Sequence, residues 1–482
     1  MSFPGALPAR APRRRRRRGA VWVAGACLAV VVVVATVLAW PGRMFCDGFV
    51  DPFTSTYSAQ VARSAEFVGS SQGPYTKAQV DTIAANTSYM FIPKFVNRFD
   101  IHTQFQQAKD LKAAAAADGH PLKVFLYISA TFWFTNNVDG WKPYSDSFNK
   151  NWYLDDANGD PIPYWGLDAD RTKDPIGYQV DLTNKAYRNW VTQLATSWTH
   201  DAPVDGIVFD NADPLIGTAD LRSQIGDGES TTNQTLCGSS TKVDSDGNCP
   251  RVAAWNTGLR EMLQQVTDAL EPSGKEVIYN GVAPSHLRVN RNQALASVTS
   301  GATNESFCYN LGVANKDKIS LNPVPDDLAM MKSFAQQGKK IFEITNYQSD
   351  TRTPYGPYCL GSFLLGWQPG SSFFIYHKSY SAPTDSLPVL PEQNLDLGTP
   401  QSTGYTTSGD VLSRTFTRGF VAVNIGDKSA TYTVPEKGTR YEAGQPTDAV
   451  EKGSTVTLPA HTAAFFLTTA SLPSAGQLLG VC

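Results

Sequence analysis

Carboxylic acids that follow short apolar segments are the residues best placed to do chemistry. The clearest case lies in the stretch Val204 to Asp213, where the apolar run Ile207 to Phe209 leads directly to Asp210. A buried parallel strand that ends in an acid delivers this acid to the mouth of a barrel. Taken alone, the motif fits equally well an aspartate that only caps the following loop or helix, because Asp favours such local hydrogen bonds.

Polar and aromatic side chains at the ends of other predicted strands enlarge the candidate set. Residues at the carboxyl ends of barrel strands face the active site. Glu305 is the second catalytic candidate, and the candidates for substrate binding are Trp133, Asp181, Asn211, Asp213, Tyr279, Asn280, Glu343, Tyr376 and His377. The set contains neither a Ser or Cys nucleophile paired with a base nor a metal triad, so we expect no metal ion and no cofactor.

This combination of side chains suits sugars. Carboxylates and amides hydrogen-bond hydroxyl groups, and glycoside hydrolysis needs two carboxyl groups across the scissile bond, one protonated and one ionised. Hydrogen bonds from Asn211 and Asn280 would keep Asp210 ionised as nucleophile or general base. Glu305, beside Phe307, suits the general acid, because apolar surroundings favour a protonated carboxyl group. A contact to substrate or a salt bridge is the alternative role for Glu305.

The elements that position these residues follow an alternating pattern. From Tyr89 onward, short apolar runs alternate with helical patterns, which is typical of βαβ units and a parallel sheet. The predicted strands are Tyr89–Phe95, Lys123–Ser129, Gln179–Leu182, Gly206–Asn211, Glu276–Gly281, Thr303–Phe307, Lys340–Thr345 and Ser372–His377. Eight such alternations predict an α/β fold, a (β/α)8 TIM barrel over residues 88–380. An open doubly wound sheet is the alternative, but no Gly-rich phosphate loop follows the first strand.

The barrel pattern ends at His377. Residues 381–410 are rich in Pro, Ser, Thr and Gly, which predicts a linker. Residues 411–482 contain short strand patterns separated by turns, and we expect a small antiparallel β-sandwich there. The segment 42–87 is an N-terminal extension whose role the pattern does not predict. Asp205, at the start of the fourth strand, is expected to be structural at the bottom of the barrel.

The N-terminus has the pattern of a membrane anchor. Residues 1–18 contain seven arginines and no acidic residue, and the apolar run from Gly19 to Trp40 is long enough to cross a bilayer. By the positive-inside rule, we expect a basic cytoplasmic tail over 1–18, a transmembrane helix over 19–41 and an extracellular catalytic domain. A cleaved signal peptide, and hence a secreted protein, is the alternative.

Charge and cysteine content agree with export. The formal net charge is −3, and without the seven arginines of the tail it is −10, which disfavours nucleic acid as a partner. Six cysteines follow the predicted anchor, an even number that suits disulfides. Their positions favour the pairs Cys237–Cys249, Cys308–Cys359 and Cys46–Cys482. Metal binding is the alternative, but no CxxC motif is present.

Several motifs, in order and spacing, resemble one family of barrel glycosidases. They are Lys123–Phe134, Trp152–Leu154 with Asn158–Ile162, Val180–Thr183 with Tyr187–Trp190, and Asp205–Asn211. The chain thereby resembles hypothetical glycosyl hydrolase family 15, which is distinct from the glucoamylases and similar to the endo-α-1,4-polygalactosaminidases. The resemblance covers about Tyr89 to His377 and the β-rich tail. It implies a barrel in which the acid of the fourth strand, here Asp210, is catalytic, and it bears less directly on Glu305.

One insertion departs from the family pattern. Between Asp213 and Arg251 the chain has a stretch rich in Gly, Ser, Thr and Asp that contains Cys237 and Cys249. We expect a loop that is pinned by a disulfide and borders the substrate site, although decoration of the surface is an equal alternative.

The sequence therefore predicts a membrane-anchored extracellular glycoside hydrolase that cleaves a cell-surface polysaccharide or exopolysaccharide with two carboxylates. The alternative is a carbohydrate-binding or structural surface protein without catalytic activity, on the same scaffold. Geometry separates the two: carboxyl groups of Asp210 and Glu305 about 5 to 10 Å apart would favour hydrolysis. The sequence does not predict the oligomeric state.

Overall fold

The computed structural model describes most of the chain from Gln60 to Thr468, with gaps. The described residues are 60–61, 65–66, 74–92, 101–119, 121–134, 147–164, 175, 177–212, 236–238, 249–282, 295–305, 307–308, 321, 323–346, 355–377 and 390–468. All of them belong to one compact unit, Asp51–Cys482. The predicted tail, the predicted anchor, Cys46, Asp213 and Cys482 lie outside the described residues. No helix within the described ranges is long and apolar enough to span a membrane.

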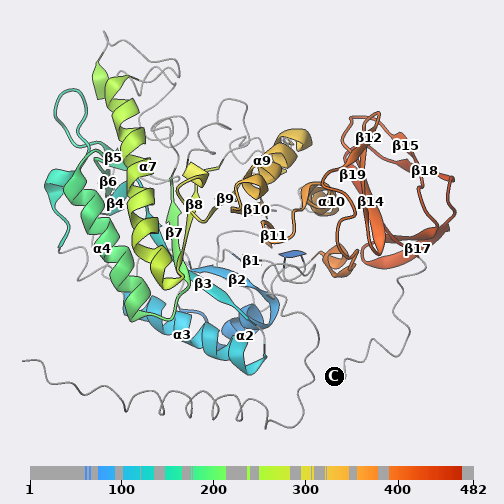
Figure 1. The fold of residues 1–482 in the computed structure, drawn as a ribbon, viewed down its shortest axis with the longest axis horizontal. Coiled ribbons are helices and arrows are strands. Elements are labelled where there is room, and N and C mark those ends of the chain that lie inside the picture. Colours follow the sequence, from blue (N-terminus) through green and yellow to red (C-terminus); the bar gives the residue numbers. More distant parts are fainter. Residues whose placement is uncertain are drawn as a thin grey trace, which may run out of the picture. The chain divides into compact units, whose positions relative to one another are not determined.

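A curled sheet of eight strands forms the centre of the fold (Figure 1). Every neighbouring pair in it is parallel. Its strands, in spatial order, are β1 (Ala65–Glu66), β2 (Tyr89–Ile92), β3 (Lys123–Ser129), β7 (Gly206–Asp210), β8 (Glu276–Asn280), β9 (Gly301–Asn304), β10 (Lys340–Asn346) and β11 (Ser372–His377). β1 also contacts β11, so the first and last strands approach each other. The predicted α/β class with a parallel sheet is confirmed.

One of the eight predicted strands is wrong. The segment predicted as Gln179–Leu182 contains only the end of β6 (Gly177–Gln179), which pairs antiparallel with β4 (Phe132–Phe134) and β5 (Pro163–Tyr164) in a separate small sheet. The eighth strand of the curled sheet is instead β1, from the N-terminal extension, which pairs with β2. A strand of two residues is too short to show a periodic pattern, and for this reason β1 was not predicted. β7 remains the fourth strand.

Helices follow most strands of the curled sheet. They are α2 (Lys77–Asn86), α3 (Ile101–Ala117), α4 (Lys185–Asp201), α7 (Pro250–Leu270), α9 (Val324–Gln336) and α10 (Gly356–Gly366). On α4, Tyr187, Val191, Leu194 and Trp198 are buried, which is the helical spacing that packs one face against a sheet. α4 and α7 contact each other and run side by side in Figure 1.

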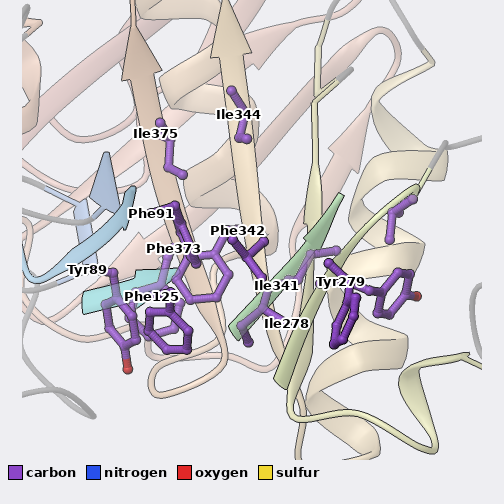
Figure 2. Close-up of a cluster of buried hydrophobic side chains, with 14 of the residues drawn as sticks. Tyr89, Phe91, Phe125, Ile278, Tyr279, Ile341, Phe342, Ile344, Phe373 and Ile375 are labelled. Carbon is purple, nitrogen blue, oxygen red and sulfur yellow. The ribbon is translucent and has the colours of Figure 1, made fainter. Parts of the chain in front are cut away.

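Alternation along the strands separates an inner layer from an outer one. Rings of Tyr89, Phe91, Phe125, Phe342 and Phe373 meet inside the curl, with centroids 4.8–6.1 Å apart in the contacting pairs (Figure 2). One step toward the amino ends of the strands, Glu276 pairs with Lys123 and, at 2.7 Å, with Lys340. The interior of the curled sheet is therefore filled by side chains at this level, and the carboxyl ends of the strands are where such folds place their active sites.

The C-terminal part is antiparallel. Six strands pair in the order β12 (Thr406–Ser408), β13 (Val411–Phe416), β14 (Gly419–Asn424), β19 (Thr462–Thr468), β16 (Gly438–Glu442) and β17 (Gln445–Val450), and β15 (Ala430–Thr433) pairs with β18 (Thr455–Leu458). Phe420 and Phe466 of the larger sheet share an apolar core with Tyr432 and Leu458 of the smaller one.

The boundaries of this part differ from those expected. The predicted linker over 381–410 contains the 3-10 helix η7 (Pro391–Asn394) and the strand β12. The run Thr415–Asn424 contains the end of β13, a turn at Thr417 and Arg418, and β14. β17 is exposed except at Val450, and β16 is mostly partly buried, so neither strand shows a pattern of alternating burial.

Two disulfides occur among the described residues. Cys237 bonds Cys249 and Cys308 bonds Cys359, which are two of the three predicted pairs. The third predicted pair involves Cys46 and Cys482, which are not described. The first pair joins two cysteines that are 12 residues apart, and the second joins the segment after β9 to α10.

Candidate active site

Asp210 ends β7 with its side chain on the inner face of the curled sheet. Its register partner on β3 is Ser129, and its carbonyl accepts a hydrogen bond from the backbone N–H of Ala130 at 2.8 Å. The carboxyl group is partly exposed. The backbone on both sides of the acid is thus fixed by the sheet, while the acid itself remains accessible.

Four donors surround the Asp210 carboxylate. Oδ1 accepts from the backbone N–H of Asn211 at 2.8 Å and from Nδ2 of Asn280 at 2.8 Å. Oδ2 accepts from the hydroxyl of Tyr127 at 2.7 Å and from Nδ2 of Asn211 at 3.0 Å. An ionised carboxylate offers only acceptors, so four donors suit that form.

The backbone of Asn211 supports this arrangement. Its φ of 55° lies in the left-handed region, which few residues other than Gly adopt, and Asn is among those that tolerate it best. This conformation lets both the backbone N–H and the side-chain amide of Asn211 reach Asp210. Asn211, expected to bind substrate, here holds the acid.

Glu305 lies directly beyond β9, and Asn280 links it to Asp210. Nδ2 of Asn280 donates to Oε1 of Glu305 at 2.6 Å and to Oδ1 of Asp210 at 2.8 Å. These two oxygens are therefore at most 5.4 Å apart, the sum of the two distances. The structure brings together the two acids that were predicted as catalytic, across one amide group.

The side chains that donate hydrogen bonds to the two acids, Tyr127 and Asn280, are more buried than the acids themselves. Asp210 and Glu305 are partly exposed, whereas Tyr127 is 1% and Asn280 is 6% exposed. Groups held in this way keep their geometry when a substrate binds, because packing fixes the supporting side chains. Two accessible carboxyl groups at this separation can act together on one bond of a bound molecule.

Tyr127 was not among the predicted site residues, although the sequence contains a signal for it. β3 matches its predicted bounds, and alternation places Tyr127 on the same face as Ser129, the last residue of this strand. Polar residues two positions before a strand end therefore belong in the search as well as those at the end.

Three predicted site residues prove to lie in the outer layer. Tyr279 and Glu343 are fully buried, and each follows an inward-facing residue by one position, which turns it toward the helices. Tyr376 is also buried; its hydroxyl lies so near α10 that a Cβ added to Gly356 would be 3.0 Å from it. All three residues lie near the carboxyl end of a strand, but the alternation of side chains along the strand turns them away from the interior of the curled sheet.

Trp133 and Asp181 are also displaced from the expected position. Trp133 is on β4, 4% exposed, and packs against Phe148 and Trp190 at 5.4 and 4.9 Å between ring centroids. Asp181 follows β6, and its Oδ1 accepts from the backbone N–H and the hydroxyl of Thr183 at 2.9 and 2.6 Å. The first is a core residue of the small sheet, and the second stabilises a turn.

The remaining predicted residues are described only in part or lie elsewhere. His377 pairs with Asn346 at the end of β11, but its side chain is not described, and Asp213 is not described at all. Asp205 lies at the opposite end of β7, where it accepts from the backbone N–H of Val124 at 2.8 Å and pairs with Lys112 at 2.5 Å. This is the structural role expected of it.

The described residues of the insertion are fastened beside the small sheet. The disulfide joins Cys237 and Cys249, and Arg251 donates to the carbonyls of Leu236 at 2.7 Å and Asp155 at 2.7 Å. Within the described part of the chain, no three metal-ligating side chains converge on a point that could hold a metal ion.

Comparison with known proteins supplies a family. The model of hypothetical glycosyl hydrolase family 15 matches residues 121–420. No curated protein matches the sequence.

Solved structures with a similar arrangement are remote in sequence. Bacillus licheniformis trehalose-6-phosphate hydrolase has 11% identity and a TM-score of 0.49, over 86% of this chain and 100% of that one. A maltogenic α-amylase from Thermotoga neapolitana has 9% identity and a TM-score of 0.48, over 86% and 99% of the two chains. The values for α-galactosidase I from Mortierella vinacea are 8% and 0.42, over 86% and 97%.

Proposed function

Because the chain belongs to hypothetical glycosyl hydrolase family 15, we propose that it is a glycoside hydrolase whose catalytic groups are the carboxyls of Asp210 and Glu305. The observation that carries this proposal is the single amide group of Asn280, which contacts both acids. Two carboxyl groups on either side of a glycosidic bond are what the reaction requires. A protein that only bound carbohydrate would not need them to converge.

The separation of the acids favours a retaining mechanism. Retaining enzymes have carboxyl groups about 5 to 5.5 Å apart, whereas inverting enzymes leave about 6.5 to 9.5 Å for a water molecule. The nearest oxygens of Asp210 and Glu305 are at most 5.4 Å apart, by the two distances to Asn280. This bound lies within the range of retaining enzymes and below the range of inverting ones.

In the first step, Glu305 gives its proton to the glycosidic oxygen as the bond from this oxygen to the anomeric carbon breaks. A carboxylate oxygen of Asp210 forms a bond to that carbon, which gives a covalent ester. In the second step, Glu305 takes a proton from water, the water oxygen bonds to the anomeric carbon, and Asp210 leaves as a carboxylate. Asn280 holds both acids in register, and Tyr127 and Asn211 stabilise the negative charge of Asp210 before and after the reaction.

The substrate class and the location complete the proposal. The arginine-rich tail, the apolar run over 19–41 and the disulfides support a protein anchored in the membrane with its catalytic part outside the cell. A cell-surface polysaccharide or an exopolysaccharide would then be the substrate. We also propose that the curled sheet closes as a (β/α)8 barrel and that the antiparallel sheets form a β-sandwich.

The stereochemistry of the product tests this proposal. We expect the ectodomain to release reducing sugar from at least one member of a panel of cell-wall polysaccharides and exopolysaccharides, with the first product keeping the anomeric configuration of the substrate. Proton NMR within the first minutes of reaction distinguishes the two anomers. An inverted product would refute the retaining mechanism. Binding of a polysaccharide without release of sugar would instead favour the carbohydrate-binding alternative.

Replacing Tyr127 by Phe is expected to slow hydrolysis by roughly 10-fold to 100-fold, because a hydrogen bond to a charged group contributes about 1.5 to 3 kcal/mol. The ring would keep its packing, since only the hydroxyl that donates to Asp210 at 2.7 Å is removed. The comparison is kcat/KM of the variant and of the wild type on the same polysaccharide. The control is Tyr153→Phe, whose ring packs against Tyr178 of the small sheet at 4.9 Å between ring centroids, and this variant should leave the rate unchanged.

A further inference from the structure

The turn that carries Glu305 is fastened at both of its ends to the outer layer of the fold. At one end, Nδ2 of Asn304 donates to Oε2 of Glu343 on β10 at 2.8 Å. At the other end, the backbone N–H of Cys308 donates to Oδ2 of Asp327 on α9 at 3.1 Å. Glu305 follows the first of these anchor points by one position and precedes the second by three.

Covalent and apolar contacts strengthen the second anchor. Cys308 has a φ of 67° and bonds Cys359 of α10, which fixes a backbone conformation that a residue with a side chain seldom adopts. Phe307 contacts Phe363 and Phe374 at 6.3 and 6.5 Å between ring centroids. These contacts draw the residues after Glu305 outward, whereas Glu305 points to Asn280.

The two acids that hold the anchors are themselves deeply buried. Glu343 is fully buried and Asp327 is 1% exposed. Burying a carboxyl group lowers the stability of the fold unless the group is hydrogen-bonded and either paired with a cation or neutral. Neither group takes part in the proposed chemistry, since both lie in the outer layer.

We infer that Asp327 and Glu343 are positioning residues, which clamp the turn after β9 and thereby hold the Glu305 carboxyl against Asn280. This inference rests on the proposed role of Glu305 as the catalytic acid. Displacing a catalytic group by about 1 Å can cost 100-fold in rate, so a clamp of this kind has a measurable effect.

The protonation of the two acids makes the clamp sensitive to alkali. Burial raises the pKa of Asp327 to about 8. Burial also raises the pKa of Glu343 well above its usual range, and the charge of Asp327 adds to this effect. Asp327 therefore loses its proton as the pH rises through about 8.

An ionised Asp327 would face other acids. Among the described residues, the titratable groups that interact with it are Asp326 on its own helix, Glu343 on β10 and Tyr358 on α10. None of these three is a cation, so none compensates a buried negative charge at Asp327, and the cost of burying this charge favours opening of the surrounding structure to water. We expect the clamp to loosen above about pH 8 and the activity to fall with it.

Crystal structures of variants test the clamp without any assay of activity. In Glu343→Ala and Asp327→Ala, we expect the contact between Nδ2 of Asn280 and Oε1 of Glu305, 2.6 Å in the wild type, to be lost. Asp327→Asn and Glu343→Gln keep an acceptor for each anchor and should keep the contact. The control is Asp326→Asn, which removes the adjacent acid on α9. An unchanged contact in folded Ala variants would overturn the inference.

If the Ala variants do not fold, crystal structures at two pH values test the clamp instead. Crystals of the wild type at about pH 6 should keep the contact, and crystals at about pH 10 should lose it, whereas Asp327→Asn should keep it at both values, because it cannot ionise. The same contact in the wild type at both pH values would contradict the clamp.

Kinetics then separate the clamp from the proposed function. On a polysaccharide that the wild type cleaves, the Ala variants should lower kcat by roughly 10-fold to 100-fold with KM changed by less than about twofold. The conservative variants should restore kcat, and Asp327→Asn should lack the alkaline fall of the wild type. If no polysaccharide is cleaved by any form, the proposed function fails, while the structural readout on Glu305 still stands or falls by itself.

Discussion

Replacement of Asp210 by Asn is expected to abolish hydrolysis, with kcat lowered by about 10⁴-fold, at the upper end of what a single catalytic group contributes. The amide has the size of the carboxylate but cannot form the covalent ester with the anomeric carbon. Asp210 is partly exposed, and its backbone is held by β3 through Ala130. The fold should therefore survive the change, which near-UV circular dichroism and the thermal midpoint would verify.

A matched substitution separates this effect from a general loss of charge. Asp181→Asn replaces a carboxylate that only closes the turn with Thr183, and the Oδ1 of Asn can still accept the same hydrogen bonds. This variant should keep the activity of the wild type. If Asp210→Asn retained more than about a tenth of the activity, or if Asp181→Asn lost it, the assignment of Asp210 as the nucleophile would be wrong.

A second substitution at Asp210 tests its role as the nucleophile. In Asp210→Ala, a small anion such as azide can occupy the vacated space and attack the anomeric carbon in place of the carboxylate. We expect azide to restore part of the activity and to give a glycosyl azide whose configuration is opposite to that of the substrate. Such rescue would not occur if Asp210 only stabilised a turn.

The sequence was a good guide to the strands that carry long apolar runs. β3 and β11 have the predicted bounds, and β7 begins at the predicted residue. A buried parallel strand is apolar on both faces, and this makes it visible as a continuous run. For the same reason the run does not say which residues point inward, and the outward positions of Tyr279, Glu343 and Tyr376 were not predicted.

Contacts between distant segments explain the rest of what the sequence missed. β1 has only two residues and is a strand because β2 pairs with it, which no local pattern records. The shared amide of Asn280 depends on the curl of the sheet, which brings β7 and the turn after β9 to both sides of β8. The pairing of Asp210 with Glu305 was a prediction from the chemistry of two acids, and the curl supplies its geometry.

The largest effect on stability is expected at Arg414, on β13 of the antiparallel sheet. Its side chain is 3% exposed, and its Nη1 donates to the carbonyls of Leu364, Leu365 and Trp367 at 3.2, 3.1 and 2.7 Å. These carbonyls lie at the C-terminal end of α10, where a helix leaves its last carbonyls without partners and favours a positive charge. Nη2 also donates to the carbonyl of Ser402 at 2.6 Å. Burial lowers the pKa of Arg414 to about 10, so the group stays charged at neutral pH.

Replacing Arg414 by Met should therefore lower the free energy of unfolding by about 3 to 5 kcal/mol, because buried carbonyls would lose their donor. The measurement is urea denaturation of the compact unit Asp51–Cys482, followed by tryptophan fluorescence. The control is Arg418→Met, since Arg418 pairs with Asp396 at the surface and such pairs contribute less than about 1 kcal/mol. Equal losses in the two variants would contradict the argument.

The same experiment shows whether the antiparallel part is an independent domain. Gly361 of α10 contacts the antiparallel sheet so closely that a Cβ there would lie 2.5 Å from the Cβ of Ala463, and Arg414 joins the end of that helix to β13. α10 in turn leads into β11, the last strand of the curled sheet. We therefore expect one cooperative transition for both parts in the wild type. Two separate transitions in Arg414→Met would mean that this buried guanidinium couples them.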